Sequence, residues 1–373
     1  MVIDRVDVHL IRIPLHHSFR TSMGTMAEKT AVIIRLQDSD GVVGYGEAPA
    51  MPNATYTEES AFSAFQCCTR DLAPLVVGRD FTSAEALLDA VQPIRGNRFA
   101  KTGFETALWD LLGRRCGEPL SVSLGGTRTR VPVGDSLEIA DSLEALLDLV
   151  DLRLSEGYRR IKLKIEPGWD RRPVEAVRQR HPDLMLTVDA NADYTLADSA
   201  LFEAMDELEL AMIEQPLAFD DLLDHSILQS RIRTPICLDE SIRSLADTRL
   251  ALHLGSTRIV NIKTGRVGGV VESRRIHDLC AANGIPVWMG GVFETGIGRS
   301  FNLAVASLAN FSLPADMSPP LMYFESDLVL VPFQIVDGYV DVPTGPGAGF
   351  DVDVDRLAFY TDEHSAFTVS DPA

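Results

Sequence analysis

The sequence predicts an α/β fold: a (β/α)8-type, TIM-like barrel with an α+β N-terminal capping domain that the C-terminal segment completes. Eight short apolar runs alternate with amphipathic helical segments from residue 131 onward. The residues before them follow a different pattern, in which strands come first and helices follow. We therefore expect a capping domain over 1–125, a (β/α) barrel domain over 126–320, and a segment over 321–373 that returns to the capping domain.

The expected capping domain begins with three strand-like segments. The second and third are joined by a short Asp-Ser-Asp-Gly turn, which is a hairpin signal. Helical patterns follow, with apolar residues spaced three and four apart. The expected strands are 1–13, 29–38 and 41–48, and the expected helices are 57–76, 82–92 and 99–117.

The eight apolar runs of the barrel are each long enough for one strand, and all but the last lead into an amphipathic segment. Repeated strand–helix units of this kind give a parallel sheet, and eight of them close into a barrel. The glycine- and proline-rich stretch VPTGPGAG in the last segment indicates irregular chain packed against the capping domain. The runs are 131–137, 159–165, 184–191, 210–217, 235–241, 258–265, 285–294 and 312–318.

The bulk composition excludes several classes of function. A formal charge of −20 leaves no basic surface for nucleic acid. The N-terminus lacks the uninterrupted apolar core of a signal peptide, and no run is long enough to cross a membrane. The five cysteines are scattered without a CxxC pair, as is typical of reduced thiols. We therefore expect a cytoplasmic protein that binds neither nucleic acid nor membrane.

Five charged residues recur at nearly constant spacing. Lys164, Asp189, Glu214 and Asp239 are each 25 positions apart, and Lys263 follows after 24. Each ends an otherwise apolar run, and the interval is about one barrel unit, given roughly 250 residues for eight. The five residues should therefore lie at one level on successive strands, at the C-terminal rim where barrel active sites are built.

A plainer interpretation exists for each residue alone. An acid that ends a strand is more often a helix N-cap, and two lysines on one strand face are more often solvated. Five residues in phase cannot all be caps, and two of them are lysines. In RIKLKI, Lys162 and Lys164 share one face, so we expect both to point into the barrel toward the carboxylates.

The three acids predict a metal site. Asp189, Glu214 and Asp239 would repel one another unless a cation lay between them. Oxygen ligands without histidine or cysteine favour Mg²⁺, with Mn²⁺ as a substitute. Glu240 follows a ligand directly and is expected in the surrounding shell. Asn191 has the same strand parity as Asp189 and is expected to orient substrate or ligand.

The lysines on opposite sides of this site predict proton transfer. A lysine acts as a base at neutral pH only if its pKa lies well below about 10.4. The metal and Lys162 are expected to lower the pKa of Lys164, and Arg266 that of Lys263. A metal that holds a small carboxylate substrate would also stabilise the charge left when the α-proton departs.

The motifs KLK, VDAN, IEQP, LDES, NIKTGRVGG and GGVFETGIGR resemble those of the muconate-lactonizing branch of the enolase superfamily. The stretches IKLKIEPGWD, TPICLDESI and VNIKTGRVGG are most similar to the o-succinylbenzoate synthase and N-succinylamino acid racemase family. RTSMGT, residues 20–25, resembles that family's mobile capping loop. The similarity extends over nearly the whole chain.

The resemblance implies that Lys164 and Lys263 are the acid/base pair and that the three acids bind the metal. It further implies that Glu294 lies near the substrate carboxylate, that the capping domain selects the substrate, and that the protein is a homo-oligomer. The reaction it favours is racemisation of N-acyl, especially N-succinyl, amino acids through an enediolate. The alternatives are syn dehydration to o-succinylbenzoate, then another cycloisomerase or epimerase, and finally a barrel that only binds.

Overall fold

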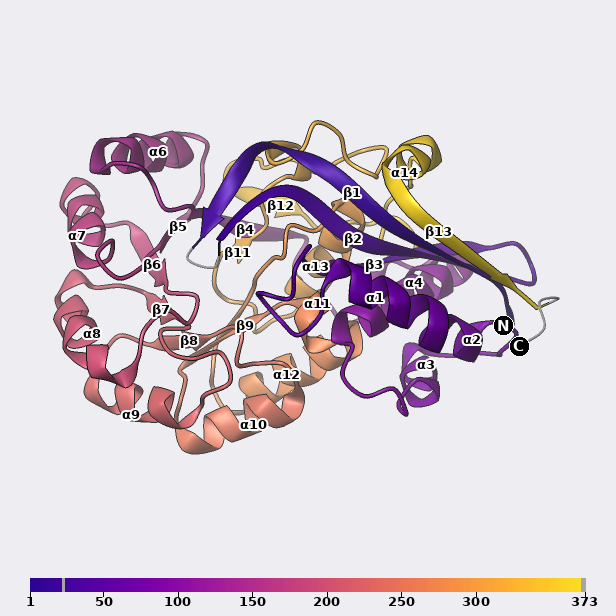
Figure 1. Cartoon of the computed structure of the whole chain (residues 1–373), viewed down its shortest axis with the longest axis horizontal. Helices are drawn as coiled ribbons and strands as arrows, with labels where there is room; N and C mark the ends of the chain where they lie inside the picture. The colour runs from indigo at the N-terminus through magenta and orange to yellow at the C-terminus, as the bar shows by residue number, and fades with distance from the viewer. Residues whose placement is uncertain (22–23, 370–373) are drawn as a thin grey trace.

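The computed structural model describes residues 1–21 and 24–369 of the chain. Figure 1 shows a barrel ringed by helices and, beside it, a capping domain built on an antiparallel sheet. Two residues of the expected capping loop, at positions 22 and 23, lie outside the described residues. None of the helices described combines the length and apolar character that a membrane crossing needs.

The barrel contains a strand in each of the eight predicted runs. The strands are parallel and follow the order β10-β9-β8-β7-β6-β5-β4-β11. They are β4 Arg130–Leu137, β5 Arg160–Lys164, β6 Met185–Asp189, β7 Met212–Glu214, β8 Ile236–Leu238, β9 Ile259–Ile262, β10 Val287–Met289 and β11 Ala315–Asp316. The predicted fold class is therefore confirmed.

Helices cover the outside of the barrel, because their apolar faces pack on the outward side chains of the strands. Serine side chains cap several of them, as Ser142 and Ser244 do by accepting a backbone N–H. A single turn, α11, directly follows β9. The helices are α6 Leu143–Ser155, α7 Arg171–Arg180, α8 Ser199–Met205, α9 Leu223–Arg231, α10 Leu245–Leu254, α11 Thr264–Val267, α12 Val270–Ala282 and α13 Gly296–Ala306.

The seventh strand is shorter than predicted. The expected run reached Glu294, but β10 ends at Met289. Side chains on Gly290 and Gly291 would collide with neighbouring residues, and Phe293 has a φ of 56°, which a strand excludes. Residues 290–295 therefore form a loop that leads into α13 over the mouth of the barrel.

The capping domain is a four-stranded antiparallel sheet of order β13-β1-β2-β3. The last strand, β13, lies beside β1, so the C-terminal segment completes this sheet as predicted. Close packing against α4 explains Gly46, where an added Cβ would lie 2.2 Å from a backbone oxygen of the helix. The strands are β1 Ile3–Thr21, β2 Gly24–Asp38, β3 Val43–Ala48 and β13 Thr361–Thr368.

The helices of the capping domain agree with the prediction except at one end. The segment expected from residue 57 begins at Ala61, because Ser60 forms a capping box there, and a π-helical turn interrupts it. The elements are α1 Ala61–Cys67, η1 Cys68–Leu72, α2 Ala73–Val76, α3 Ala84–Ala90, α4 Arg98–Cys116 and α5 Leu120–Ser123. The returning segment adds β12 Tyr339–Asp341, which pairs with β4, and α14 Val354–Tyr360.

Candidate active site

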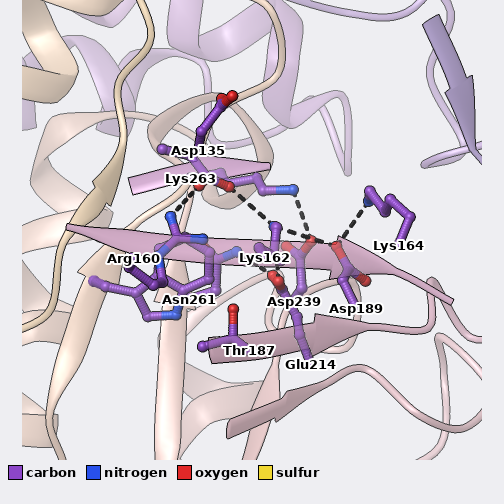
Figure 2. A network of polar contacts seen from close by, with 12 residues as sticks. Asp135, Arg160, Lys162, Lys164, Thr187, Asp189, Glu214, Asp239, Asn261 and Lys263 are labelled. Atoms are coloured by element: carbon purple, nitrogen blue, oxygen red, sulfur yellow. Dashed lines mark hydrogen bonds and ion pairs between the residues drawn. The ribbon is translucent and has the colours of Figure 1, made fainter. Parts of the chain in front are cut away.

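The five in-phase residues lie together at the C-terminal rim of the barrel. Lys164 pairs in register with Asp189, and Asp189 with Glu214, across parallel strands. Asp239 and Lys263 each follow the last residue of their strand, β8 and β9. Figure 2 shows the side chains converging, and the three acids are at most 1 % exposed. The five residues, which are evenly spaced along the chain, thus lie at one level of the barrel.

Lys162 lies at the centre of the buried charges. Its Nζ donates to Glu214 Oε2 at 2.8 Å and lies 3.2 Å from Asp189 Oδ2. On its other side it lies 2.9 Å from Asp316 Oδ2 on β11. The side chain points into the barrel as predicted, and one ammonium group bridges three carboxylates from different strands.

The two proposed acid/base lysines are each paired with one of the acids. Lys164 Nζ donates to Asp189 Oδ2 at 2.8 Å and to Asn191 Oδ1 at 2.5 Å. Lys263 Nζ donates to Asp239 Oδ2 at 2.6 Å. Asn191 thus lies beside the site, but not through strand alternation, because β6 ends at Asp189 and Asn191 has a left-handed φ of 42°.

These contacts set the protonation of the central groups. Burial raises the pKa of Asp189, but Lys164 and Lys162 outweigh burial and leave that pKa well below its usual value. Burial lowers the pKa of Lys162, but Asp316 and Glu214 outweigh it, so the pKa of this lysine is raised. Asp189 and Lys162 thus stabilise each other's charged forms at the centre of the site.

The pKa of Lys263 moves opposite to the sequence expectation. Burial lowers it, but Tyr56 and Glu214 outweigh burial and raise the pKa. The expected help from Arg266 is absent because its guanidinium forms a close ion pair with Asp239 instead. The prediction of a lowered Lys263 pKa is therefore wrong for this arrangement, in which anionic groups surround the amine.

The donors suit a divalent cation in type, since they are carboxylate oxygens at the ends of three successive strands. The Lys162 ammonium also marks a cation position between Asp189 and Glu214. Among residues 1–21 and 24–369, however, no three His, Cys, Asp or Glu side chains surround one point. Each acid instead contacts an ammonium group. Binding of one ion by all three acids, Asp239 included, therefore requires the side chains of Lys162 and Lys263 to move away.

A second layer of polar groups holds the acids in place. Tyr56 Oη, from the capping domain, donates to Asp239 Oδ1 at 3.0 Å, and Arg266 Nη1 donates to Tyr56 Oη at 3.2 Å. Asn191 Nδ2 donates to Glu240 Oε1 at 3.0 Å, while Glu240 Oε2 is buried without a hydrogen-bond partner. Burial raises the pKa of Glu240. Glu240 and Arg266 thus lie in the shell around the acids.

Several members of this network were not predicted from the sequence. Arg160 and Asn261 precede Lys162 and Lys263 by two positions, so strand parity alone would have placed them inside the barrel. Asn261 Nδ2 donates to Glu214 Oε1 at 2.6 Å, and Arg160 forms a close ion pair with Asp316. No periodic signal marks Tyr56, because it reaches the site from a loop of the other domain.

A cavity of about 490 Å³ lies between the capping domain and the rim of the barrel. Its walls include Lys162, Lys164 and Lys263 from the barrel and Phe19 and Tyr56 from the capping domain. The three acids do not belong to its lining and lie behind the lysines. A molecule in the cavity therefore meets the amines directly.

Glu294 is displaced from its expected position. It follows β10 by five residues, is buried, and does not line the cavity. Its Oε1 accepts from Asn302 Nδ2 at 2.9 Å, and its Oε2 lies 3.3 Å from Arg299 Nε. Arg299 does line the cavity, so Glu294 reaches it only through this arginine. That Glu294 lies near a substrate carboxylate, as a binding residue or in the surrounding shell, stays a prediction, and in this structure its contact with the cavity wall runs through Arg299.

Comparison with known proteins identifies the fold's family. Residues 145–356 match the family described as "Enolase C-terminal domain-like", and residues 5–125 match "Mandelate racemase / muconate lactonizing enzyme, N-terminal domain". The chain belongs to the enolase superfamily. The resemblance inferred from the motifs is therefore confirmed.

Relatives of this superfamily member include both synthases and racemases. The chain is 44 % identical over 359 residues to an o-succinylbenzoate synthase of Geobacillus kaustophilus, covering 96 % of each chain. It is 44 % identical over 349 residues to an N-succinylamino acid racemase of Thermus thermophilus, covering 94 % of each. A solved structure of an enolase superfamily member from Listeria innocua superimposes with a TM-score of 0.95, at 38 % identity and 99 % coverage of both chains.

One of these relatives is a lyase and the other is an isomerase. The predicted enzyme class, an isomerase with a lyase as the alternative, is therefore confirmed. Both are named for small carboxylate compounds. Membership of the superfamily also implies a divalent metal ion.

Proposed function

We propose that the protein is a Mg²⁺-dependent racemase of N-acyl amino acids, most specifically of N-succinyl amino acids, which removes and returns the α-proton through an enediolate. The observation that carries this proposal is the placement of Lys164 and Lys263. Both amines line one cavity, and their strands, β5 and β9, are separated by three others in the sheet order. Two amines on opposite sides of a bound α-carbon are what a two-base racemisation needs.

Asp189, Glu214 and Asp239 would hold the metal, with Glu240 and Asn191 beside them. When bound, Mg²⁺ supplies positive charge that stabilises the oxygens of the enediolate. Lys162, whose ammonium lies beside two of these acids, would have to leave that position for the ion. It also lines the cavity, where its positive charge would lie next to the substrate.

The lysines perform the proton transfer. For one enantiomer, neutral Lys164 takes the α-hydrogen as a proton, and the C–H electron pair enters the enediolate. The ammonium of Lys263 then donates its proton to the opposite face of that carbon, so the configuration is inverted. The other enantiomer reacts in the reverse direction with the roles exchanged. Each turnover leaves one amine protonated and the other neutral, which conserves the charge of the site.

An aromatic wall lines the cavity near the capping domain. Phe293 packs edge-to-face on Phe19 at 4.9 Å and on Tyr323 at 5.0 Å between ring centroids. These rings come from the barrel loop, β1 and the returning segment, and all three line the cavity. An apolar amino acid side chain would be buried there, which favours large apolar substrates.

A lyase is the second candidate, because a relative of the same 44 % identity is an o-succinylbenzoate synthase. In that reaction one lysine removes the proton while the other remains an ammonium group near the developing charge. The synthase needs only one base. Variants of the second lysine therefore separate the two candidates.

Deuterium exchange tests the proposal. Wild-type enzyme with Mg²⁺ in D₂O should exchange the α-proton of both enantiomers of N-succinyl-phenylalanine, as followed by proton NMR. K164A and K263A should each lose exchange from one enantiomer preferentially, while K101A, a lysine outside the cavity lining, should behave as wild type. Normal exchange of both enantiomers by K263A would refute the two-base scheme. Exchange of neither by the wild type would refute the racemase proposal.

A further inference from the structure

Arg299 offers a buried guanidinium to the cavity. It lies in the first turn of α13, its side chain is 4 % exposed, and it contributes to the cavity wall. Nη1 donates to the backbone oxygen of Asp316 and lies 3.7 Å from the sulfur of Met317. Nε is buried without a hydrogen-bond partner, although Glu294 Oε2 is 3.3 Å away. A buried cation with an unfilled donor is costly unless a further partner completes its hydrogen bonding.

The carboxylates on the cavity wall form no ion pair with Arg299, since each has another partner. Asp135 accepts from Arg153 Nε at 2.7 Å, and Asp316 Oδ2 lies 2.9 Å from Lys162 Nζ. Glu28 pairs with an arginine of β1 at the exposed side. Among the described residues, the ion-pair partner of the Arg299 guanidinium is therefore Glu294, which approaches from behind the wall.

We propose that Arg299 binds the remote carboxylate of the substrate, the one at the far end of a succinyl chain, and thereby selects dicarboxylates over neutral N-acyl compounds. This inference rests on the proposed function for the identity of the reacting end. A guanidinium suits the task, because its planar fork of N–H donors matches the two oxygens of a carboxylate. Glu294 holds Arg299 in place and is a positioning residue.

The separation between the reacting centre and Arg299 fits such a chain. A Cβ added to Gly290 would lie 2.7 Å from Lys263 Cε, and one added to Gly291 would lie 2.7 Å from Arg299 Nη1. The Lys263 side chain and the Arg299 guanidinium thus lie beside two adjacent glycines, so the distance between the two groups is on the order of 10 Å or less. A succinyl amide reaches about 6 Å from the α-carbon to its remote carboxyl carbon, which leaves room for a hydrogen bond at each end.

The same carboxylate is present in both candidate reactions, because a succinyl chain appears in the names of both kinds of relative. The inference therefore concerns recognition and does not depend on whether one or two lysines move protons. A neutral amide in place of the carboxylate would leave the buried guanidinium charge unmatched, and this is the basis of the selectivity.

The test compares two ligands that differ only at the remote end: N-succinyl-phenylalanine and its carboxamide, N-succinamoyl-phenylalanine. Wild type should favour the carboxylate in kcat/KM by about 100-fold, mainly through KM. R299Q should reduce this preference to within about threefold, because kcat/KM should fall much more for the carboxylate than for the carboxamide, and R299K should retain part of it. R275Q, on an exposed face of α12, should keep the wild-type preference.

Three outcomes would overturn the inference: a wild type without preference, an R299Q variant that keeps it, or equal losses on both ligands in R299Q and R299K. If R299Q does not fold, R299K alone must lower the preference. Binding of the same two ligands to the Mg²⁺-loaded enzyme, measured by calorimetry, separates this inference from the proposed function. An enzyme that exchanges neither ligand but binds the carboxylate about tenfold more tightly through Arg299 would refute only the racemase.

Discussion

Tyr56 and Asp239 join the two domains through a hydrogen bond of 3.0 Å between a phenol and a carboxylate. Tyr56 comes from the loop after β3 in the capping domain, and Asp239 follows β8 of the barrel. The Lys263 ammonium lies 4.6 Å above the Tyr56 ring, and Arg266 donates to the same hydroxyl. One side chain of the capping domain therefore touches a proposed metal ligand and a proposed base together.

We expect Y56F to lower kcat/KM for exchange by roughly tenfold to a hundredfold, because a hydrogen bond to a charged group contributes about 1.5–3 kcal/mol. The ring remains, so folding stability should change little. Y45F is the matched control, because Tyr45 does not line the cavity. Steady-state exchange rates of both variants check this, and an unchanged Y56F would mean that the hydroxyl does not position the site.

Removal of divalent metal should abolish exchange. Dialysis against a chelator leaves Asp189, Glu214 and Asp239 with their protein partners only, and added Mg²⁺ should restore activity. Because the ion binds only the folded state, it should also raise the unfolding free energy, by about 2.7 kcal/mol at 100 times its Kd. Exchange assays measure the first effect, and calorimetry of wild type and E214Q with and without Mg²⁺ measures the second. Full activity after exhaustive chelation would contradict the assignment of these ligands.

F293A should narrow the range of substrates by removing one ring of the aromatic wall. The expected loss in kcat/KM is about 10- to 200-fold for N-succinyl-phenylalanine and much smaller for N-succinyl-alanine, since apolar contacts of this size contribute about 1–3 kcal/mol. Alanine keeps the Cβ, so the strain at φ 56° is unchanged. F62A, at an exposed phenylalanine, is the control. Equal losses on both substrates would mean that Phe293 serves folding and not selection.

The stability of the capping sheet should depend on pH through Asp7. Burial raises the pKa of Asp7, but hydrogen bonds from Arg5 and His364 outweigh it and lower the pKa to about 2. An acid with a lowered pKa stabilises the fold above its unfolded value, 3.8, and loses that contribution as the pH falls through about 2. D7N should therefore cost about 2 kcal/mol at pH 7 and less at pH 3.

Urea unfolding at the two pH values measures this difference. D4N, at an exposed position of β1, should unfold as wild type at both. A gap between D7N and wild type that stays constant from pH 7 to pH 3 would show that the lost contribution is packing and not charge.

The sequence alone determined the barrel, the level of its rim and the residues that gather there. Those properties are periodic: one strand–helix unit about every 25 residues puts Lys164, Asp189 and Glu214 in register, and alternation within a strand puts Lys162 on the inner face. Periodicity carries this information because regular secondary structure fixes where each side chain points before any tertiary contact forms.

Only the tertiary structure decided what these residues touch. Tyr56 and Arg299 reach the cavity from a capping loop and from a barrel helix, and no periodic pattern in the sequence predicts either position. Glu294 turned behind Arg299 because the chain after β10 bends in a left-handed conformation at Phe293. Raised lysine pKa values likewise depend on the distances to acids from other strands. Contacts between irregular segments are set by the packing of two domains, which no local pattern encodes.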